Sequence, residues 1–225
     1  SVNRLCASGL SAIAGAARGI AVGEGDLYVA GGVENMTRAP YVMSKASSAY
    51  GRDSELFDTS LGWRFVNPKM HDVYGSDPMG VTAENVAELH GVSRADQDAF
   101  ALRSQQRAAA AQAAGRLAEE IVPIEIPQRK GPALRVEHDE FLRPDTTLAT
   151  LGKLRPAFRT DGKGSVTAGN SSGLNDGAAA MLLASGDAAK AMGLTPVARV
   201  VASAAAGVGS DSSTGDRARR TRRNR

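Results

Sequence analysis

Apolar residues near the start of the chain recur at three- and four-residue steps, which is the spacing of one helix face. They are Leu10, Ile13, Ala14, Ala17 and Ala21. Glycines at positions 9, 15 and 19 remove side-chain bulk from the same stretch, so that other parts of the chain can approach closely. The pattern therefore predicts a small, apolar helix that is buried on this face.

Strand and helix patterns then alternate, which indicates an α/β protein. The pattern at residues 24–32 is typical of a turn, a buried strand and a glycine pair. Residues 40–80 lack periodicity, which indicates a loop with short elements. Thr82 is the expected N-cap of a following helix, with Glu84 in its first turn and Gly91 at its end.

The next helix is expected to begin at Ser93, with Asp96 three residues on as a capping partner, and to end at Gly115. Residues 119–127 predict an edge strand, because prolines lie near its ends. The segment 164–185 predicts a strand, a tight polar turn and an apolar strand. A short helix at 186–193 and a buried strand from residue 197 follow in the prediction.

Composition indicates a globular protein of one large or two small domains, and 42% of the 225 residues are hydrophobic. No apolar run approaches the roughly 20 residues that span a membrane, and no signal-peptide pattern precedes the first helix. A single cysteine excludes an internal disulfide framework and favours a reducing compartment. We therefore expect a cytoplasmic protein without a membrane partner.

The basic charge of the chain is confined to its last residues. Residues 209–225 hold six Arg and two Asp, a net charge of +4, so residues 1–208 carry −1 of the total of +3. Without apolar residues to bury, this tail is predicted to be disordered, and a frameshifted reading of the gene is one hypothesis for its origin. A nucleic-acid-binding arm is the less favoured alternative, since no aromatic residue or folded module accompanies the arginines.

Cys6 is the first candidate for chemistry, because it lies just before the predicted N-terminal helix. The start of a helix presents unpaired N–H groups and a positive dipole end, which favour the reactive thiolate form of a cysteine. A core cysteine that acts as a small hydrophobic residue is the alternative. From its position alone, the two interpretations stay open.

Several separate motifs closely resemble the thiolase family over about residues 1–208. They are NRLCASGL at 3–10, DLYVAGG and VENMTRAP at 26–40, TAENVAELHG at 82–91, the block at 137–158, and TAGNSSG at 167–173. The run DTSLGWRFVNPKM at 58–70 is similar to thiolases that act on 3-oxoadipyl-CoA. Pro78 occupies a position that is His in biosynthetic thiolases, which argues against that subgroup.

The resemblance implies site residues at matching positions. Cys6 would be the nucleophile that becomes acylated by a CoA thioester, with coenzyme A as a substrate and no permanently bound cofactor or metal. The implied CoA-binding residues are Met79, Arg143, Thr150, Ala168, Gly169 and Ser172. Without the resemblance, a surface ion pair with Asp139 or Glu140 would be the favoured interpretation of Arg143.

The resemblance also implies a layered αβαβα thiolase fold, represented by a chain that is incomplete at both ends. The expected parts are the first section of the N-terminal half (1–45), a CoA-binding loop domain (46–163), a return to the N-terminal half (164–193) and the start of a C-terminal half (194–208). The family's activating His and second Cys are not recognisable in this sequence. His71, His90 and His138 lie outside matching motifs.

The expected function is acyl transfer by a 3-oxoacyl-CoA thiolase, with 3-oxoadipyl-CoA as the favoured substrate and acetyl-CoA and succinyl-CoA as products. An acetyl-CoA acetyltransferase and an inactive thiolase fragment are the alternatives. CoA thioesters are the expected partners, and the full-length family member is expected to be a homodimer or homotetramer.

Overall fold

The computed structural model describes residues 1–206, which form two compact units. Unit 1 contains Ser1–Ser60 and the described part of Leu174–Val208, and unit 2 contains Leu61–Gly173. The predicted Arg-rich tail at 209–225 lies outside the described residues. The family-based boundaries at 45, 163 and 193 remain a prediction, and the two units are described separately below.

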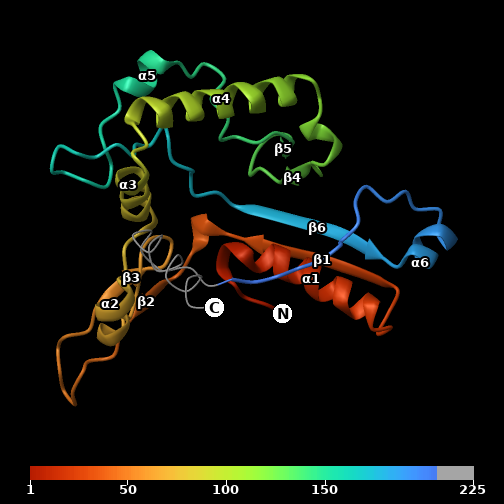
Figure 1. Cartoon of the computed structure of the whole chain (residues 1–225), viewed down its shortest axis with the longest axis horizontal. Coiled ribbons are helices and arrows are strands. Elements are labelled where there is room, and N and C mark those ends of the chain that lie inside the picture. Colours follow the sequence, from red (N-terminus) through yellow and green to blue (C-terminus); the bar gives the residue numbers. More distant parts are fainter. Residues whose placement is uncertain (207–225) are drawn as a thin grey trace, which may run out of the picture. The chain divides into compact units, whose positions relative to one another are not determined.

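Unit 1 is built around an antiparallel pair of long strands and one helix (Figure 1). Strand β1 (Leu27–Glu34) pairs with β6 (Gly177–Ala184) over eight residues, from Leu27 opposite Ala184 to Glu34 opposite Gly177. Its other elements are η1 (Leu5–Ala7), α1 (Ser8–Ala21), η2 (Met36–Arg38), β2 (Tyr41–Met43), β3 (Leu56–Asp58) and α6 (Gly186–Ala191). The short strands β2 and β3 form a second antiparallel pair.

The core of unit 1 lies between α1 and one face of the β1–β6 pair. Ala16 of α1, Ala30 of β1 and Leu183 of β6 are buried there, and Ile13 and Tyr28 are among the half-buried residues around them. Because α1 presents the small residues Ala16 and Gly19 to this core, helix and strands approach closely. A β-carbon at Gly19 would lie 2.7 Å from the Tyr28 hydroxyl oxygen.

The predicted buried face of α1 is partly wrong. Ile13, Ala14 and Ala17 are half-buried as expected, but Leu10 is 75% exposed and Ala21 is also exposed. The buried positions are Ala16 and Gly19. Helical spacing therefore located the buried face of α1 only approximately. The face that is buried centres on Ala16 and Gly19, and Gly19 lies against Tyr28.

Unit 2 consists of helices and one short strand pair. Its elements are α2 (Pro68–Tyr74), α3 (Met79–His90), α4 (Arg94–Ala113), η3 (Leu117–Glu119), β4 (Ile124–Ile126), β5 (Leu134–Val136) and α5 (Leu148–Gly152). Strands β4 and β5 are antiparallel, and α5 packs against α4 (Figure 1). The 20-residue α4 begins as predicted, since the Ser93 hydroxyl accepts a hydrogen bond from the Asp96 N–H at 3.1 Å.

Three local predictions are wrong. Helix α3 starts at Met79 with Pro78 as its N-cap, so Thr82 lies inside the helix. The strand expected before the polar turn is irregular, because side chains of Glu84 and Asn170 accept the hydrogen bonds of its N–H groups. The strand expected from residue 197 is also absent from the described residues, and Val197 is 100% exposed.

A strand needs a neighbouring strand to pair with its backbone N–H and C=O groups. In the part of the chain that the structure describes, no strand pairs with residues 197–206. No helix within residues 1–206 is both long and apolar enough to cross a membrane.

Candidate active site

Cys6 lies in the 3-10 turn η1, directly before α1, and its side chain is exposed. The next residue, Ala7, is the N-cap of α1 and makes no side-chain capping bond. No capping side chain therefore occupies the first N–H groups of α1, and Cys6 directly precedes this helix end in the chain. This position supports the nucleophile interpretation over that of a core cysteine, because a core residue would be buried.

The turn that presents Cys6 is held by short polar contacts. The Ser8 hydroxyl donates to the Leu5 carbonyl at 2.7 Å and accepts from the Arg4 N–H at 2.9 Å. The Asn3 side chain accepts from the Leu5 N–H at 3.0 Å, and Leu5 has a φ of 52°. A positive φ is uncommon outside glycine, so these bonds hold a backbone shape that the chain would otherwise avoid.

All six predicted CoA-binding residues lie in unit 2, whereas Cys6 lies in unit 1. Ala168, Gly169 and Ser172 belong to the polar turn at 167–173, and Ala168 and Ser172 are exposed. Within the turn, the Thr167 hydroxyl accepts from the Gly169 N–H at 3.2 Å, and the Ser171 hydroxyl donates to the Thr167 carbonyl at 2.7 Å. The turn thus exposes amide and hydroxyl groups that can bind an amide-containing ligand.

Unit 2 brings the turn close to the predicted block at 137–158, which contains Arg143 and Thr150. A β-carbon at Gly169 would lie 2.6 Å from Leu151 Cδ2 in α5, the helix that contains Thr150. The ring of Phe141, two residues before Arg143, lies against Gly173. Thr150 itself forms a capping box with Thr147 and is exposed. The block at 137–158 therefore meets the turn at two places, through Leu151 and Phe141.

Arg143 and Met79 are both exposed. The Arg143 guanidinium donates to the carbonyl oxygens of Glu140 and Leu142 and lies 5.7 Å from the Phe141 ring centre. Among the described residues it forms no ion pair with a carboxylate, so the surface ion pair is not observed. Met79 is the first residue of α3, and no described contact joins it to the turn.

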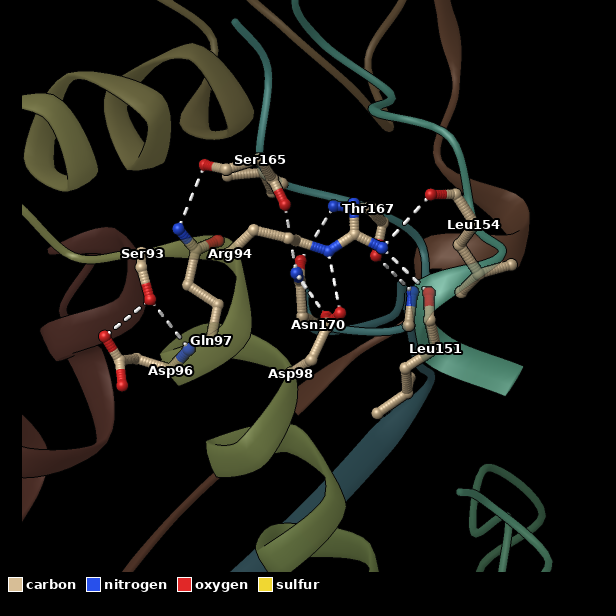
Figure 2. Close-up of polar contacts among 12 residues, drawn as sticks. Ser93, Arg94, Asp96, Gln97, Asp98, Leu151, Leu154, Ser165, Thr167 and Asn170 are labelled. Atoms are coloured by element: carbon tan, nitrogen blue, oxygen red, sulfur yellow. Dashed lines mark hydrogen bonds and ion pairs between the residues drawn. The ribbon is translucent and has the colours of Figure 1, made fainter. Parts of the chain in front are cut away.

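Two buried carboxylates hold this region, and no local sequence pattern marks them as a site. Glu84 of α3 is 2% exposed and Asp98 of α4 is 5% exposed. Figure 2 shows Asp98, Arg94 and Asn170 directed toward one another, with the Arg94 side chain extending to the end of α5. The sequence predicted Glu84 only as a residue of the first helical turn, and the fold places it against the loop at Ser165.

Hydrogen bonds keep Glu84 charged despite its burial. Burial alone would raise its pKa, but the N–H groups of Val166 and Ser165, the Ser165 hydroxyl and the charge of Arg159 together lower the pKa below its ordinary value. The four bonds to its oxygens are between 2.8 and 3.0 Å long. Glu84 therefore acts as a fixed acceptor, not as a proton donor near neutral pH.

Histidine chemistry is not apparent in either unit. His71, His90 and His138 are exposed, and only His71 has a described side-chain bond, to Ser76 at 2.7 Å. Among residues 1–206 there is no cluster of His, Cys, Asp and Glu that could bind a metal ion.

Comparison with known proteins identifies the family. The family model for the thiolase N-terminal domain matches residues 1–187. The β-ketoadipyl-CoA thiolase of Pseudomonas aeruginosa is 62% identical over 207 residues, and the 3-oxoadipyl-CoA/3-oxo-5,6-dehydrosuberyl-CoA thiolase of Escherichia coli K12 is 59% identical over the same length. Each alignment covers 92% of this chain and 51% of the relative, so the chain spans about half the length of these proteins.

A solved structure agrees with this assignment. Human mitochondrial 3-ketoacyl-CoA thiolase in complex with CoA superposes with a TM-score of 0.72 at 39% identity, covering 87% of this chain and 47% of that one. The helices and strands described above are therefore part of a thiolase fold. Because the family model matches most of the sequence, the chain belongs to the thiolase family.

Proposed function

We propose that this chain supplies the acyl-accepting cysteine and part of the CoA-binding site of a 3-oxoacyl-CoA thiolase, with 3-oxoadipyl-CoA as the substrate. The supporting observation is an exposed Cys6 at the start of α1, in a chain 59–62% identical to two thiolases named for 3-oxoadipyl-CoA or β-ketoadipyl-CoA. These relatives and Pro78 both disfavour an acetyl-CoA acetyltransferase.

The proposed reaction begins when the Cys6 thiolate attacks the 3-oxo carbonyl carbon of the substrate. The bond between carbons 2 and 3 breaks, and its electron pair leaves with the acetyl-CoA part, which takes up a proton. A succinyl group remains on the Cys6 sulfur. The thiol of a second CoA then loses its proton and attacks the acyl-cysteine, which releases succinyl-CoA and restores the Cys6 thiolate.

CoA would be held in unit 2 by groups suited to its parts. The exposed turn at 167–173 offers hydrogen bonds to the amides of the pantetheine arm, and Ser172 is the favoured contact. Arg143 would bind the nucleotide end, because a guanidinium can pair with phosphate or stack on adenine. Thr150 and Met79 complete the proposed set. For the full-length protein we also propose a homodimer or homotetramer.

Intact-mass spectrometry after incubation with acetyl-CoA tests the nucleophile. We expect a mass increase of one acetyl group, which the Cys6→Ala variant loses. No adduct, together with iodoacetamide labelling of Cys6 no faster than that of a free thiol, would contradict the proposal and favour a fragment that at most binds CoA.

A second incubation tests the substrate. With 3-oxoadipyl-CoA in place of acetyl-CoA, Cys6 should gain the mass of a succinyl group while acetyl-CoA appears in solution. If acetoacetyl-CoA acylates Cys6 and 3-oxoadipyl-CoA does not, the acetyltransferase alternative is correct.

A further inference from the structure

Three charged side chains fix the polar turn at 167–173, and they come from helices α3 and α4. Of the proposed CoA contacts, these two helices contain only Met79. The charged residues Glu84, Arg94 and Asp98 form a polar network with Ser165, Thr167 and Asn170. A buried carboxylate is costly unless every lone pair is used, so the destinations of these bonds indicate what the charges stabilise.

Glu84 binds the chain just before the turn. Its Oε1 accepts from the N–H groups of Ser165 and Val166, each at 2.9 Å, and its Oε2 accepts from the Ser165 hydroxyl at 2.8 Å. Without a strand on this side, Glu84 takes the place of a ladder partner for two consecutive N–H groups. It therefore determines where the chain enters the turn.

Asp98 binds the turn itself, through Asn170. Its Oδ1 accepts from Asn170 Nδ2 at 3.0 Å, and the same amide nitrogen donates to the Ser165 carbonyl at 3.1 Å. The amide oxygen of Asn170 accepts from the Thr167 N–H at 2.7 Å. Asp98 thus fixes which way the Asn170 amide faces, and that amide closes the turn.

Arg94 extends the network to α5. Its Nε donates to Asp98 at 2.8 Å, while its Nη2 donates to the carbonyl oxygens of Leu151 at 2.8 Å and Leu154 at 3.1 Å (Figure 2). Leu151 is also the residue whose side chain lies against Gly169. One guanidinium therefore connects the carboxylate that orients the turn with the helix that contains Thr150.

From these contacts we propose that Glu84 and Asp98 are positioning residues for CoA binding, which hold the turn at 167–173 and, through Arg94, helix α5 in one relative geometry. The inference rests on the proposed function only for the identity of the ligand. Neither carboxylate contacts the ligand in this proposal. Each determines the shape of backbone that does.

Hydrogen exchange of single amides, measured by NMR on the whole chain, tests the geometry without any ligand. In Asp98→Asn, a donor replaces an acceptor facing Arg94 or Asn170, so the Thr167 amide should exchange about tenfold faster or more. The Ser165 and Val166 amides should change little, because Glu84 still holds them. Glu84→Gln should give the opposite pattern, with faster exchange at Ser165 and Val166.

Titration of the same variants with CoA, followed by calorimetry, tests the link to binding. Glu84→Gln and Asp98→Asn should each raise the Kd for CoA by about tenfold. Two controls should leave the Kd unchanged. Glu88→Gln lies one turn further along α3 and removes only an exposed pair with Arg159, and Ser93→Ala removes the cap of α4 without touching the turn.

The outcomes separate the two proposals. If exchange rises uniformly across unit 2 in both variants, the carboxylates only stabilise the fold and the positioning proposal is overturned. An unchanged Kd in both variants, with CoA bound by the unmodified chain, overturns it as well. If the unmodified chain does not bind CoA but exchange changes locally as expected, the CoA site is wrong and the positioning of the turn stands.

Discussion

Two adjacent glycines in β1 differ in whether their surroundings leave room for a side chain. Gly31 and Gly32 are neighbours in β1 and form the glycine pair that the sequence placed at the end of the predicted strand. A β-carbon at Gly31 would lie 2.7 Å from the Ala179 carbonyl oxygen of β6, whereas one at Gly32 would have no heavy atom within 4 Å. Successive strand residues face opposite sides, so the strand contact requires only one of the pair.

We therefore predict opposite effects for Gly31→Ala and Gly32→Ala. Gly31→Ala should lower the free energy of unfolding by about 1–3 kcal/mol, because the backbone of β6 would have to shift. Gly32→Ala should be neutral or raise it by about 0.5 kcal/mol, because alanine restricts the unfolded chain. Urea unfolding followed by circular dichroism measures both, and equal losses in the two variants would contradict the assigned contact.

The residue scale also shows the limit of prediction for the site. Cys6 was predicted as a site residue from its sequence position and motif, and the structure confirms that it lies directly before a helix. Glu84 and Asp98 were not found as a site, because their partners at Ser165 and Asn170 lie 81 and 72 residues away. No spacing in the sequence indicates such a contact.

At the scale of elements, a helix start was predicted correctly where neighbouring residues alone form its N-cap. Ser93 and Asp96 start α4 as expected, since the whole motif spans four residues. Helix α3 begins four residues earlier than expected, because its N-cap is Pro78, with no side-chain capping bond, and not Thr82. Glu84 is therefore in the second turn and contacts the loop at Ser165 instead of the start of its own helix.

The charge of Glu84 makes the stability of unit 2 depend on pH. Its folded-state pKa is below the ordinary value of 4.5, so its stabilisation is complete above that value and is lost as the pH falls through the folded-state pKa. Near neutral pH, Glu84→Gln should cost about 1.5–3 kcal/mol of unfolding free energy. This difference should shrink as the medium becomes more acidic than pH 4.5.

Urea unfolding of both proteins across this range measures the difference. Glu88→Gln is the matched control, because Glu88 lies in the same helix but its side chain is 70% exposed, and its loss should cost less than about 1 kcal/mol. A cost for Glu84→Gln that does not vary with pH would show that the group is not charged in the folded protein.

At the scale of the whole chain, many large apolar side chains are exposed. Helix α1 covers the face of the β1–β6 pair that contains Tyr28, Ala30 and Leu183, so the alternate residues face the other way. Val29 and Leu182, which are paired in register, are 73% and 49% exposed on that other face. Such a continuous apolar strand face favours self-association.

We predict that this face binds the dye ANS and promotes concentration-dependent association. Replacing Val29 and Leu182 together with threonine should reduce both the dye fluorescence and the mass measured by light scattering. Val197→Thr is the control, because Val197 is fully exposed outside any strand and its replacement should change neither reading. An unchanged double variant would mean that association uses another surface.

The sequence by itself determined the features that depend on neighbouring residues or on close relatives. These were the thiolase family, the position of Cys6 before a helix, the cap of α4, the turn at 167–173 and the strands that became β1 and β6. Hydrophobic period, capping and turn chemistry act over a few residues, so a linear pattern records them.

Only the tertiary structure decided which distant groups satisfy one another. It placed Glu84 and Asp98 against the polar turn, set Leu151 against Gly169 and left residues 197–206 without a strand partner. The physical reason is that a buried charge or an unpaired backbone group must find its partner in space. That partner is chosen by how the helices and loops pack, which no local pattern in the sequence specifies.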